Sequence, residues 1–188
     1  TGYTATSISE LVKVTHLKPG SLYGAFNSKR GLFLEVLNVY AHNRQAVIKE
    51  RLASQATPLT GLRHYLNLLI EEMDLSSAHA QTDLVIKTMV ELGSEDTEIR
   101  DFAKQHLDAI ELLVSNTLSA AQASGEIGEE ANPAMMARFI VTNIVGMRVT
   151  GNAYPKREEF EQIIEQMLTV LAIKIPTTVS VPVHSVSA

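Results

Sequence analysis

The 188-residue sequence contains no cysteine and no tryptophan, and only 5% of its residues are aromatic. The lack of cysteine excludes disulfides, thiolate zinc sites and cysteine nucleophiles, and it fits a reducing cytoplasm. Glycine and proline are few, with 10 and 6 residues. Because Ala, Leu, Glu and Gln recur between these helix breakers, we expect an all-α protein.

Long apolar runs are also missing. The most apolar stretch, residues 139–149, is interrupted by Thr142, Asn143 and Arg148, and it is shorter than the roughly 18 residues that a membrane span requires. No stretch reads as a signal peptide or an anchor. We therefore expect a cytoplasmic protein that makes no contact with the membrane.

The motifs of common enzymes are absent as well. The sequence has no Gly-x-Ser-x-Gly elbow, no His-Glu-x-x-His, no phosphate-binding loop and no dinucleotide fingerprint. Its six histidines are scattered, and His42, His64, His79 and His106 have no adjacent acid or second histidine at ligand spacing. We expect no enzymatic activity, no cofactor and no metal site.

The net charge of −5 is divided unevenly along the chain. Residues 1–34 carry four basic side chains and one acidic one, a net charge of +3. The rest carries twelve basic and twenty acidic side chains, a net charge of −8. A basic head on an acidic body suggests a nucleic-acid surface at one end only, although an uneven solvated surface would explain the charges equally well.

Hydrophobic periodicity divides the chain into helices. Ser7 and Glu10 form a capping-box pattern at the start of a helix of about two turns. Residues 15–17 separate this helix from a second short one, which Lys18 and Pro19 open. Further helices are expected over residues 28–52, 58–73, 83–92, 97–125, 133–151 and 157–173.

Two short helices joined by a three-residue break are typical of a helix-turn-helix, whose second helix enters the DNA major groove. The second helix carries three small residues that would let it approach base edges closely, namely Gly20, Ser21 and Gly24. The Tyr23 hydroxyl can hydrogen-bond to a phosphate or a base. Lys18 and Lys29 lie at successive helix starts, where free backbone N–H groups favour phosphate. A packed helix pair with no DNA role is the alternative.

Three short motifs support a family assignment. They are the Gly-Tyr…Thr-Ser opening, Lys-Pro-Gly-Ser-Leu-Tyr-x-x-Phe at residues 18–26, and Ser-Lys-x-x-Leu-Phe at residues 28–33. Together they resemble the DNA-binding domain of the TetR family of repressors. The resemblance covers the second and third helices of the family's three-helix head. Gly2 and Tyr3 resemble a helix end, so we expect the first helix to be missing from this sequence.

The resemblance implies roles for individual residues. Ser7 and Lys29 would contact phosphates. The face toward the groove would consist of Lys18, Pro19, Gly20, Ser21, Tyr23 and Gly24.

The rest of the chain resembles the family in the number and length of its helices, and residues 146–149 resemble part of its dimerisation region. The resemblance implies a homodimer through helices 133–150 and 157–173, although intramolecular packing of their apolar faces would serve equally well. Candidates for an effector pocket are polar or soft residues on otherwise apolar helices, with ordinary packing as the alternative. These are Tyr65, Lys87, Met89, His106 and Asn143.

The sequence thus predicts three parts. Residues 1–46 form a DNA-binding domain that is incomplete at its N-terminus, residues 47–175 form a ligand-binding and dimerisation domain, and residues 176–188 form an extended or disordered tail. We expect a dimeric repressor that binds double-stranded operator DNA and that a small-molecule effector releases. The alternative is a helical ligand-binding or scaffolding protein whose head does not recognise DNA.

Overall fold

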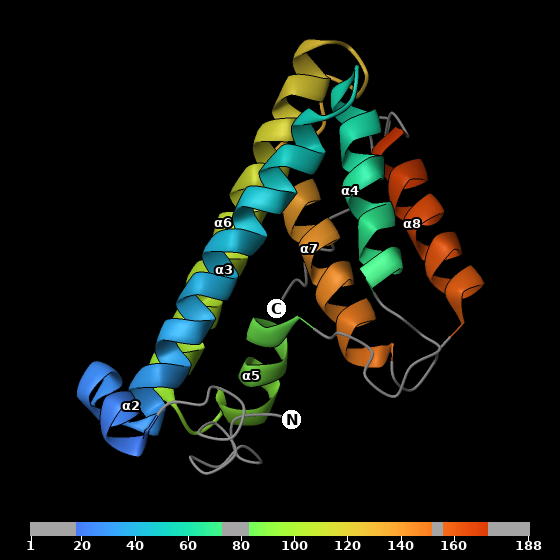
Figure 1. Ribbon diagram of the computed structural model, residues 1–188. Helices are drawn as coiled ribbons and strands as arrows, with labels where there is room; N and C mark the ends of the chain where they lie inside the picture. Colours follow the sequence, from blue (N-terminus) through green and yellow to red (C-terminus); the bar gives the residue numbers. More distant parts are fainter. Residues whose placement is uncertain (1–17, 73–82, 152–155, 173–188) are drawn as a thin grey trace, which may run out of the picture.

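The computed structural model describes residues 18–72, 83–151 and 156–172 (Figure 1). Every regular element within these ranges is an α-helix, which confirms the expected all-α fold. The helices are α2 (Pro19–Phe26), α3 (Lys29–Ala53), α4 (Pro58–Glu72), α5 (Leu84–Leu92), α6 (Thr97–Ala123), α7 (Pro133–Thr150) and α8 (Arg157–Ala172). The ends of α3 to α8 all lie within two residues of the predicted ones.

Polar side chains determine where the helices begin. Each accepts a hydrogen bond from a free backbone N–H of the first turn, as an N-cap does. The capping residues are Ser28 before α3, Asp83 before α5, Asp96 before α6 and Asn132 before α7. Helix α6 ends just ahead of Gly125, whose φ of 78° lies in the left-handed region that favours glycine.

The two longest helices, α3 and α6, lie side by side and form one arm of the molecule (Figure 1). The short helix α2 lies at the end of this arm where α3 begins. Helices α4, α7 and α8 pack together toward the other end of α3, and α5 contacts α3, α6 and α7. The arm therefore connects the α2 end directly with the interior of the bundle.

Two apolar clusters fill this bundle. The proximal cluster, near α2, has as its buried members Leu37, Ala41, Val85, Ile99 and Ala103. The distal cluster is larger and joins α3, α4, α6, α7 and α8, with Ile48 and Ile110 at its near edge. Between the clusters, the buried stripe of α3 is occupied by Arg44 and that of α6 by His106. One level of the bundle is therefore polar.

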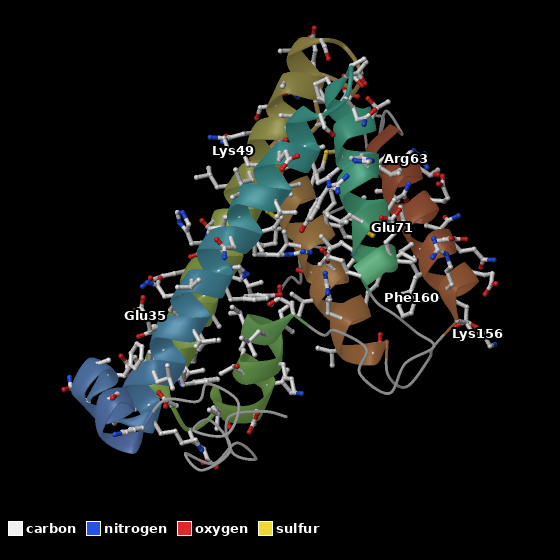
Figure 2. All side chains as sticks on the ribbon, viewed as in Figure 1. Glu35, Lys49, Arg63, Glu71, Lys156 and Phe160 are labelled. Carbon is white, nitrogen blue, oxygen red and sulfur yellow. The ribbon has the colours of Figure 1, made fainter. Side chains whose placement is uncertain are left out.

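Surface ion pairs add contacts between helices. Arg63 on α4 pairs with Glu165 on α8, and Figure 2 shows Arg63 on the side of α4 that faces α8. None of the helices in the described ranges combines the length and apolar character needed to cross a bilayer.

Helix α3 runs without a break through the predicted boundary at residues 46 and 47, so the two predicted domains share one helix. The capping box at Ser7, the missing first helix and the tail 176–188 concern residues outside the described ranges.

Candidate functional site

Helix α2 presents small residues to solvent. Gly20, Ser21 and Gly24 are exposed, and a Cβ added to either glycine would meet no atom within 4 Å. A glycine inside a helix costs roughly 0.5–1 kcal/mol relative to alanine. Because no packing contact of α2 in the described part of the chain requires these glycines, their small size suits a partner that approaches the helix from outside.

The angle between α2 and α3 is set by a tight junction. Asn27 has a φ of 60°, a left-handed conformation that asparagine tolerates better than most residues. Ser28 Oγ then accepts a hydrogen bond from Gly31 N at 3.0 Å. A Cβ on Gly31 would lie 2.1 Å from the carbonyl oxygen of Phe26, so only glycine fits at this turn.

The predicted DNA contacts gather at this end of the molecule. Lys18 is exposed immediately before α2, and Lys29 is half-buried at the first position of α3. Ser7 and the side chains of Pro19 and Tyr23 lie outside the described part of the structure. Contact of all these residues with DNA stays a prediction.

Arg30 joins the α2 end to α6. Its Nη1 and Nη2 donate to Asp96 Oδ2 at 2.5 Å and Oδ1 at 3.1 Å, and Nη2 also donates to Glu98 Oε2 at 2.6 Å. Asp96 also caps α6 by accepting from Ile99 N. The hydrogen bond from Arg30 lowers the pKa of Asp96, with a smaller contribution from that backbone N–H. The start of α6 is thus tied to the first turn of α3.

Residues of α3, α4, α6 and α7 and the N-cap of α5 form the polar level between the two apolar clusters. We call it the polar layer, and it consists of Tyr40, Arg44, Tyr65, Glu72, Asp83, His106 and Arg148. Glu72, the last residue of α4, accepts from two buried arginines. Arg44 Nη1 donates to Oε1, and Arg148 Nη2 donates to Oε2 at 2.7 Å. Burial alone would raise the pKa of Glu72, but the hydrogen bonds and charges of the arginines outweigh it and lower the pKa.

Asp83, the N-cap of α5, uses both carboxylate oxygens. Oδ1 accepts from the backbone N–H groups of Val85 and Ile86 at 3.0 and 3.2 Å. Oδ2 accepts from the Tyr40 hydroxyl at 3.2 Å and lies 3.9 Å from Arg44 Nε. Burial, followed by the charge of Asp83, raises the pKa of Tyr40 to about 12. Tyr40 therefore remains a hydrogen-bond donor at neutral pH.

His106 is the layer's unsatisfied residue. Only 2% of it is exposed, and within the described part of the chain neither Nδ1 nor Nε2 has a hydrogen-bond partner. Burial lowers its pKa, the negative charge of Asp83 acts in the opposite direction, and the positive charge of Arg44 adds to the lowering. His106 also lines a crevice of about 300 Å³ between α3 and α6. The imidazole is therefore neutral and buried, and it borders an opening to solvent.

The five predicted effector residues do not form one site. Tyr65 and His106 both lie in the polar layer. Lys87 is exposed on α5, and Met89 packs half-buried against the proximal cluster. Asn143 lies on α7, where its Nδ2 donates to the carbonyl oxygen of Phe139 at 2.8 Å. Contact of any of them with an effector stays a prediction.

Sequence reasoning missed four charged members of the polar layer, namely Arg44, Glu72, Asp83 and Arg148. Arg44 could have been found, because it occupies an apolar position of a helical stripe between Ala41 and Ile48. Arg148 falls in a similar apolar run. Glu72 and Asp83 lie at helix ends, where acidic residues are ordinary, so only the fold reveals their partners.

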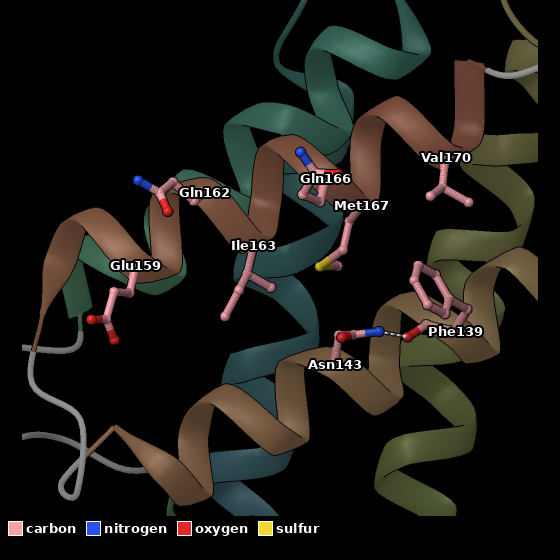
Figure 3. Close-up of a pocket in the computed structure, with 8 residues that line it drawn as sticks. All are labelled: Phe139, Asn143, Glu159, Gln162, Ile163, Gln166, Met167 and Val170. Atoms are coloured by element: carbon pink, nitrogen blue, oxygen red, sulfur yellow. Dashed lines mark hydrogen bonds between the residues drawn. The ribbon is translucent and has the colours of Figure 1, made fainter.

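A second apolar surface lies between α7 and α8. Figure 3 shows Ile163, Met167 and Val170 of α8 pointing toward Phe139 and Asn143 of α7. The groove between them has a volume of about 420 Å³. Phe139, Ile163 and Val170 remain 42%, 37% and 42% exposed, which is unusual for large apolar side chains that lie together.

Two parts of the chain match models of one protein family. Residues 1–36 match the model described as bacterial regulatory proteins, tetR family, and residues 58–167 match the tetracyclin repressor-like C-terminal domain. The second match alone covers more than half of the chain.

Two bacterial transcription regulators are similar in sequence to this chain over most of its length. The HTH-type transcriptional repressor ComR of Escherichia coli is 27% identical over 168 residues, which cover 86% of this chain and 77% of ComR. The HTH-type transcriptional regulator YezE of Bacillus subtilis is 21% identical over 171 residues, covering 90% of this chain and 88% of YezE.

Solved structures share the fold. The regulatory protein TetR from Rhodobacter sphaeroides superposes with a TM-score of 0.80 at 18% identity, covering 90% of this chain and 89% of that one. A cysteine mutant of the TetR family regulator CifR, complexed with 26-bp operator DNA, gives a TM-score of 0.78 at 23% identity, covering 90% and 88%. With both domain models matched and the fold shared, the chain belongs to the TetR family of bacterial regulatory proteins.

Proposed function

We propose that this chain is a ligand-responsive transcriptional repressor that binds a palindromic operator as a homodimer. The observation that carries the proposal is the exposed small-residue face of α2, formed by Gly20, Ser21 and Gly24 and held at a fixed angle by the junction to α3. The relative ComR is described as a repressor, and the CifR mutant is complexed with operator DNA. Both descriptions support a DNA role here.

In this proposal α2 enters the major groove. A helix whose outer face lacks bulky side chains can bring its backbone close to base edges. Lys18 and Lys29 flank α2 and would bind phosphates of the adjoining backbone, and Ser7 would add a phosphate contact. Pro19 and Tyr23 would complete the surface that faces the bases. Residues 1–46 then act as the DNA-binding domain.

The apolar groove of α7 and α8 is the proposed dimer surface. Packed against the same groove of a second copy, Phe139, Ile163 and Val170 would lose their contact with water in a two-fold arrangement. Such a dimer presents two copies of α2, and half-sites about 34 to 36 Å apart, or a multiple of that spacing, would match them. Residues 47–175 would thus hold both the dimer surface and the effector site.

The polar layer is the proposed effector site. A buried set of polar groups inside an apolar bundle is the usual character of a small-molecule site. The unsatisfied His106 lies on α6, and Asp96, which binds Arg30, lies at the start of the same helix. A ligand that shifts α6 would change the position of α2, with a coupling of about 1 to 3 kcal/mol.

The proposal assigns no catalytic reaction to the chain, in keeping with a family of transcription regulators. Because a transcriptional repressor acts on DNA, we place the protein in the cytoplasm.

Selection of binding sequences from a random DNA pool tests the proposal. The full chain is immobilised, and the bound DNA is sequenced after several rounds at about 150 mM salt. A repressor dimer should enrich one inverted repeat with half-site centres about one helical turn, or a multiple, apart. Enrichment of no sequence would instead favour the helical ligand-binding or scaffolding protein.

A further inference from the structure

Among the described residues, the buried side-chain atoms that lack a hydrogen-bond partner are the two ring nitrogens of His106. Both oxygens of Glu72 and both oxygens of Asp83 already accept hydrogen bonds. Arg44 donates to Glu72 through Nη1, and its Nε lies 3.9 Å from Asp83 Oδ2. A neutral imidazole adds one N–H donor and one acceptor nitrogen, and both are unmet in His106. Within the described part of the chain, His106 therefore lacks an acceptor for its N–H.

The crevice between α3 and α6 gives access to this place. It has a volume of about 300 Å³, and His106 and Ala41 form its buried part. The exposed Asn38 and Gln105 and the half-buried Gln45 also line it, and Phe102 adds an apolar wall. A small molecule fits this mostly polar crevice with a hydrogen-bonding group toward His106 and its apolar side against Phe102.

The net charge of the polar layer limits which charged group the ligand can carry at its polar end. The layer holds two arginines and two carboxylates, so it is neutral while His106 is neutral. A bound monoanion would leave one negative charge uncompensated in a buried place, which is costly. An imidazolium at His106 would restore neutrality and would turn both ring nitrogens into donors. A dianion such as a phosphate monoester would still leave one charge unpaired.

We propose that the effector is a small organic monocarboxylate, which accepts a hydrogen bond from His106 and binds together with one proton that His106 takes up. The inference deepens the proposed repressor function by naming the class of ligand. The proton comes from solvent and adds to the imidazole, no covalent bond to the ligand forms, and the carboxylate keeps its charge.

The direction of the pH dependence follows from the groups around His106. These come from α3, α4, α5 and α7, and they are Tyr40, Arg44, Tyr65, Glu72, Asp83 and Arg148, with His42 at the crevice. Burial keeps the pKa of His106 low in the free protein, whereas an adjacent carboxylate would raise it. Carboxylate binding should therefore tighten as pH falls, by up to about tenfold per pH unit.

Titration calorimetry tests this directly. Hexanoate and benzoate are titrated into the full chain at pH 7, in two buffers of different ionisation enthalpy, so that the protons taken up can be counted. Hexanamide and benzamide serve as neutral controls of the same shape. At least one carboxylate should bind with uptake of about one proton and more tightly than its amide. The inference is wrong if neither carboxylate binds, if the amides bind equally well, or if no proton is taken up.

Two variants at the site and one control complete the test. His106→Leu should weaken carboxylate binding at least tenfold. His106→Gln keeps a donor that does not titrate, so it should bind more weakly than the native chain and without proton uptake. His64→Gln, on α4 and paired with Arg51, should behave like the native chain. Equal proton uptake in the His106 and His64 variants would overturn the role of His106.

Operator binding measured in parallel without any carboxylate separates the two claims. If the chain binds its operator but no carboxylate, the ligand class is wrong and the repressor function stands. If a carboxylate binds with proton uptake and no operator is recognised, the repressor function is wrong and the site stands.

Discussion

Arg30, in the first turn of α3, donates hydrogen bonds to both carboxylate oxygens of Asp96, the residue that caps α6. The pair joins the base of the DNA-binding end to a helix that reaches deep into the bundle. His106 lies ten residues further along α6, which is about 15 Å at 1.5 Å per residue. Because a helix transmits displacement as a nearly rigid rod, the pair couples the polar layer to α2.

Loss of this pair should affect DNA binding more than folding. In Arg30→Gln, α2 is held less firmly against the body, so we expect operator affinity to fall roughly two- to tenfold. The thermal midpoint should change little, because the pair is partly exposed to solvent and ion pairs near the surface contribute little to stability. Arg157→Gln, which breaks an exposed pair with Glu161 on α8, is the control. Equal operator affinity in the two variants, measured by fluorescence anisotropy, would contradict this coupling.

Removal of the Glu72 carboxylate should destabilise the fold. Glu72→Gln leaves Arg44 and Arg148 buried without their shared counterion, and we expect a loss of about 1 to 3 kcal/mol in the free energy of unfolding. Glu165→Gln is the matched control, since Glu165 binds Arg63 at the surface and its loss should have little effect. Urea titrations followed by circular dichroism give both values. Similar midpoints for the two variants would show that the layer does not stabilise the fold.

Stability should depend on pH through His106. Because burial lowers its pKa in the folded chain, the unfolded chain binds more protons below its ordinary pKa of about 6.5. Stability is therefore lost as pH falls below about 6.5, by up to about 1.4 kcal/mol per unit, until His106 protonates in the folded chain. The pKa of Glu72 is lowered as well, so its contribution is also lost as pH falls, but this loss begins only below its ordinary pKa of about 4.3.

The variant His106→Leu removes the imidazole that titrates and with it the two buried ring nitrogens that lack hydrogen-bond partners in the described part of the chain. We expect it to be more stable than the native chain by about 1 kcal/mol or more at pH 6, with a flat profile between pH 5 and 7. Thermal unfolding across this pH range measures the difference. A native profile as flat as that of His106→Leu would mean that the folded and unfolded chains bind the same number of protons at His106, which would contradict a buried, neutral imidazole.

The helices could be predicted from local signals. Ser28, Asp96 and Asn132 cap helices near the predicted starts, and Pro19 and Pro133 occupy first helical positions, because these preferences depend on a single turn of backbone. The polar layer could not be predicted in the same way. Its ion pair between Glu72 and Arg148 joins residues 76 positions apart in sequence, so the pairing depends on the packing of the whole bundle.

His106 illustrates the limit of the sequence pattern. A single histidine on an apolar face is consistent with a satisfied core residue as well as with a ligand-binding one. Only the fold shows that both ring nitrogens are buried, lack partners within the described residues, and adjoin the crevice between α3 and α6.

A charge placed in the α7–α8 groove should dissociate the proposed dimer. In Phe139→Asp a carboxylate would be buried at the interface without a partner, and we expect the dimer dissociation constant to rise roughly 100-fold or more. Leu112→Asp is the control, because Leu112 is a 62% exposed apolar residue on α6, outside the groove. Sedimentation velocity at micromolar concentrations distinguishes the two species. A dimer that persists in Phe139→Asp would place the interface elsewhere.

The operator affinity of Gly24→Leu tests the central claim most directly. A Cβ at this position meets no atom within 4 Å, so the fold should be unaffected or gain up to about 1 kcal/mol in stability. If α2 enters the major groove, the leucine blocks its approach. Fluorescence anisotropy at 150 mM salt, on the inverted repeat obtained by selection, should give roughly nanomolar binding for the native chain and for Ala46→Leu on α3. Gly24→Leu should bind at least roughly tenfold more weakly, and undiminished binding would contradict the account.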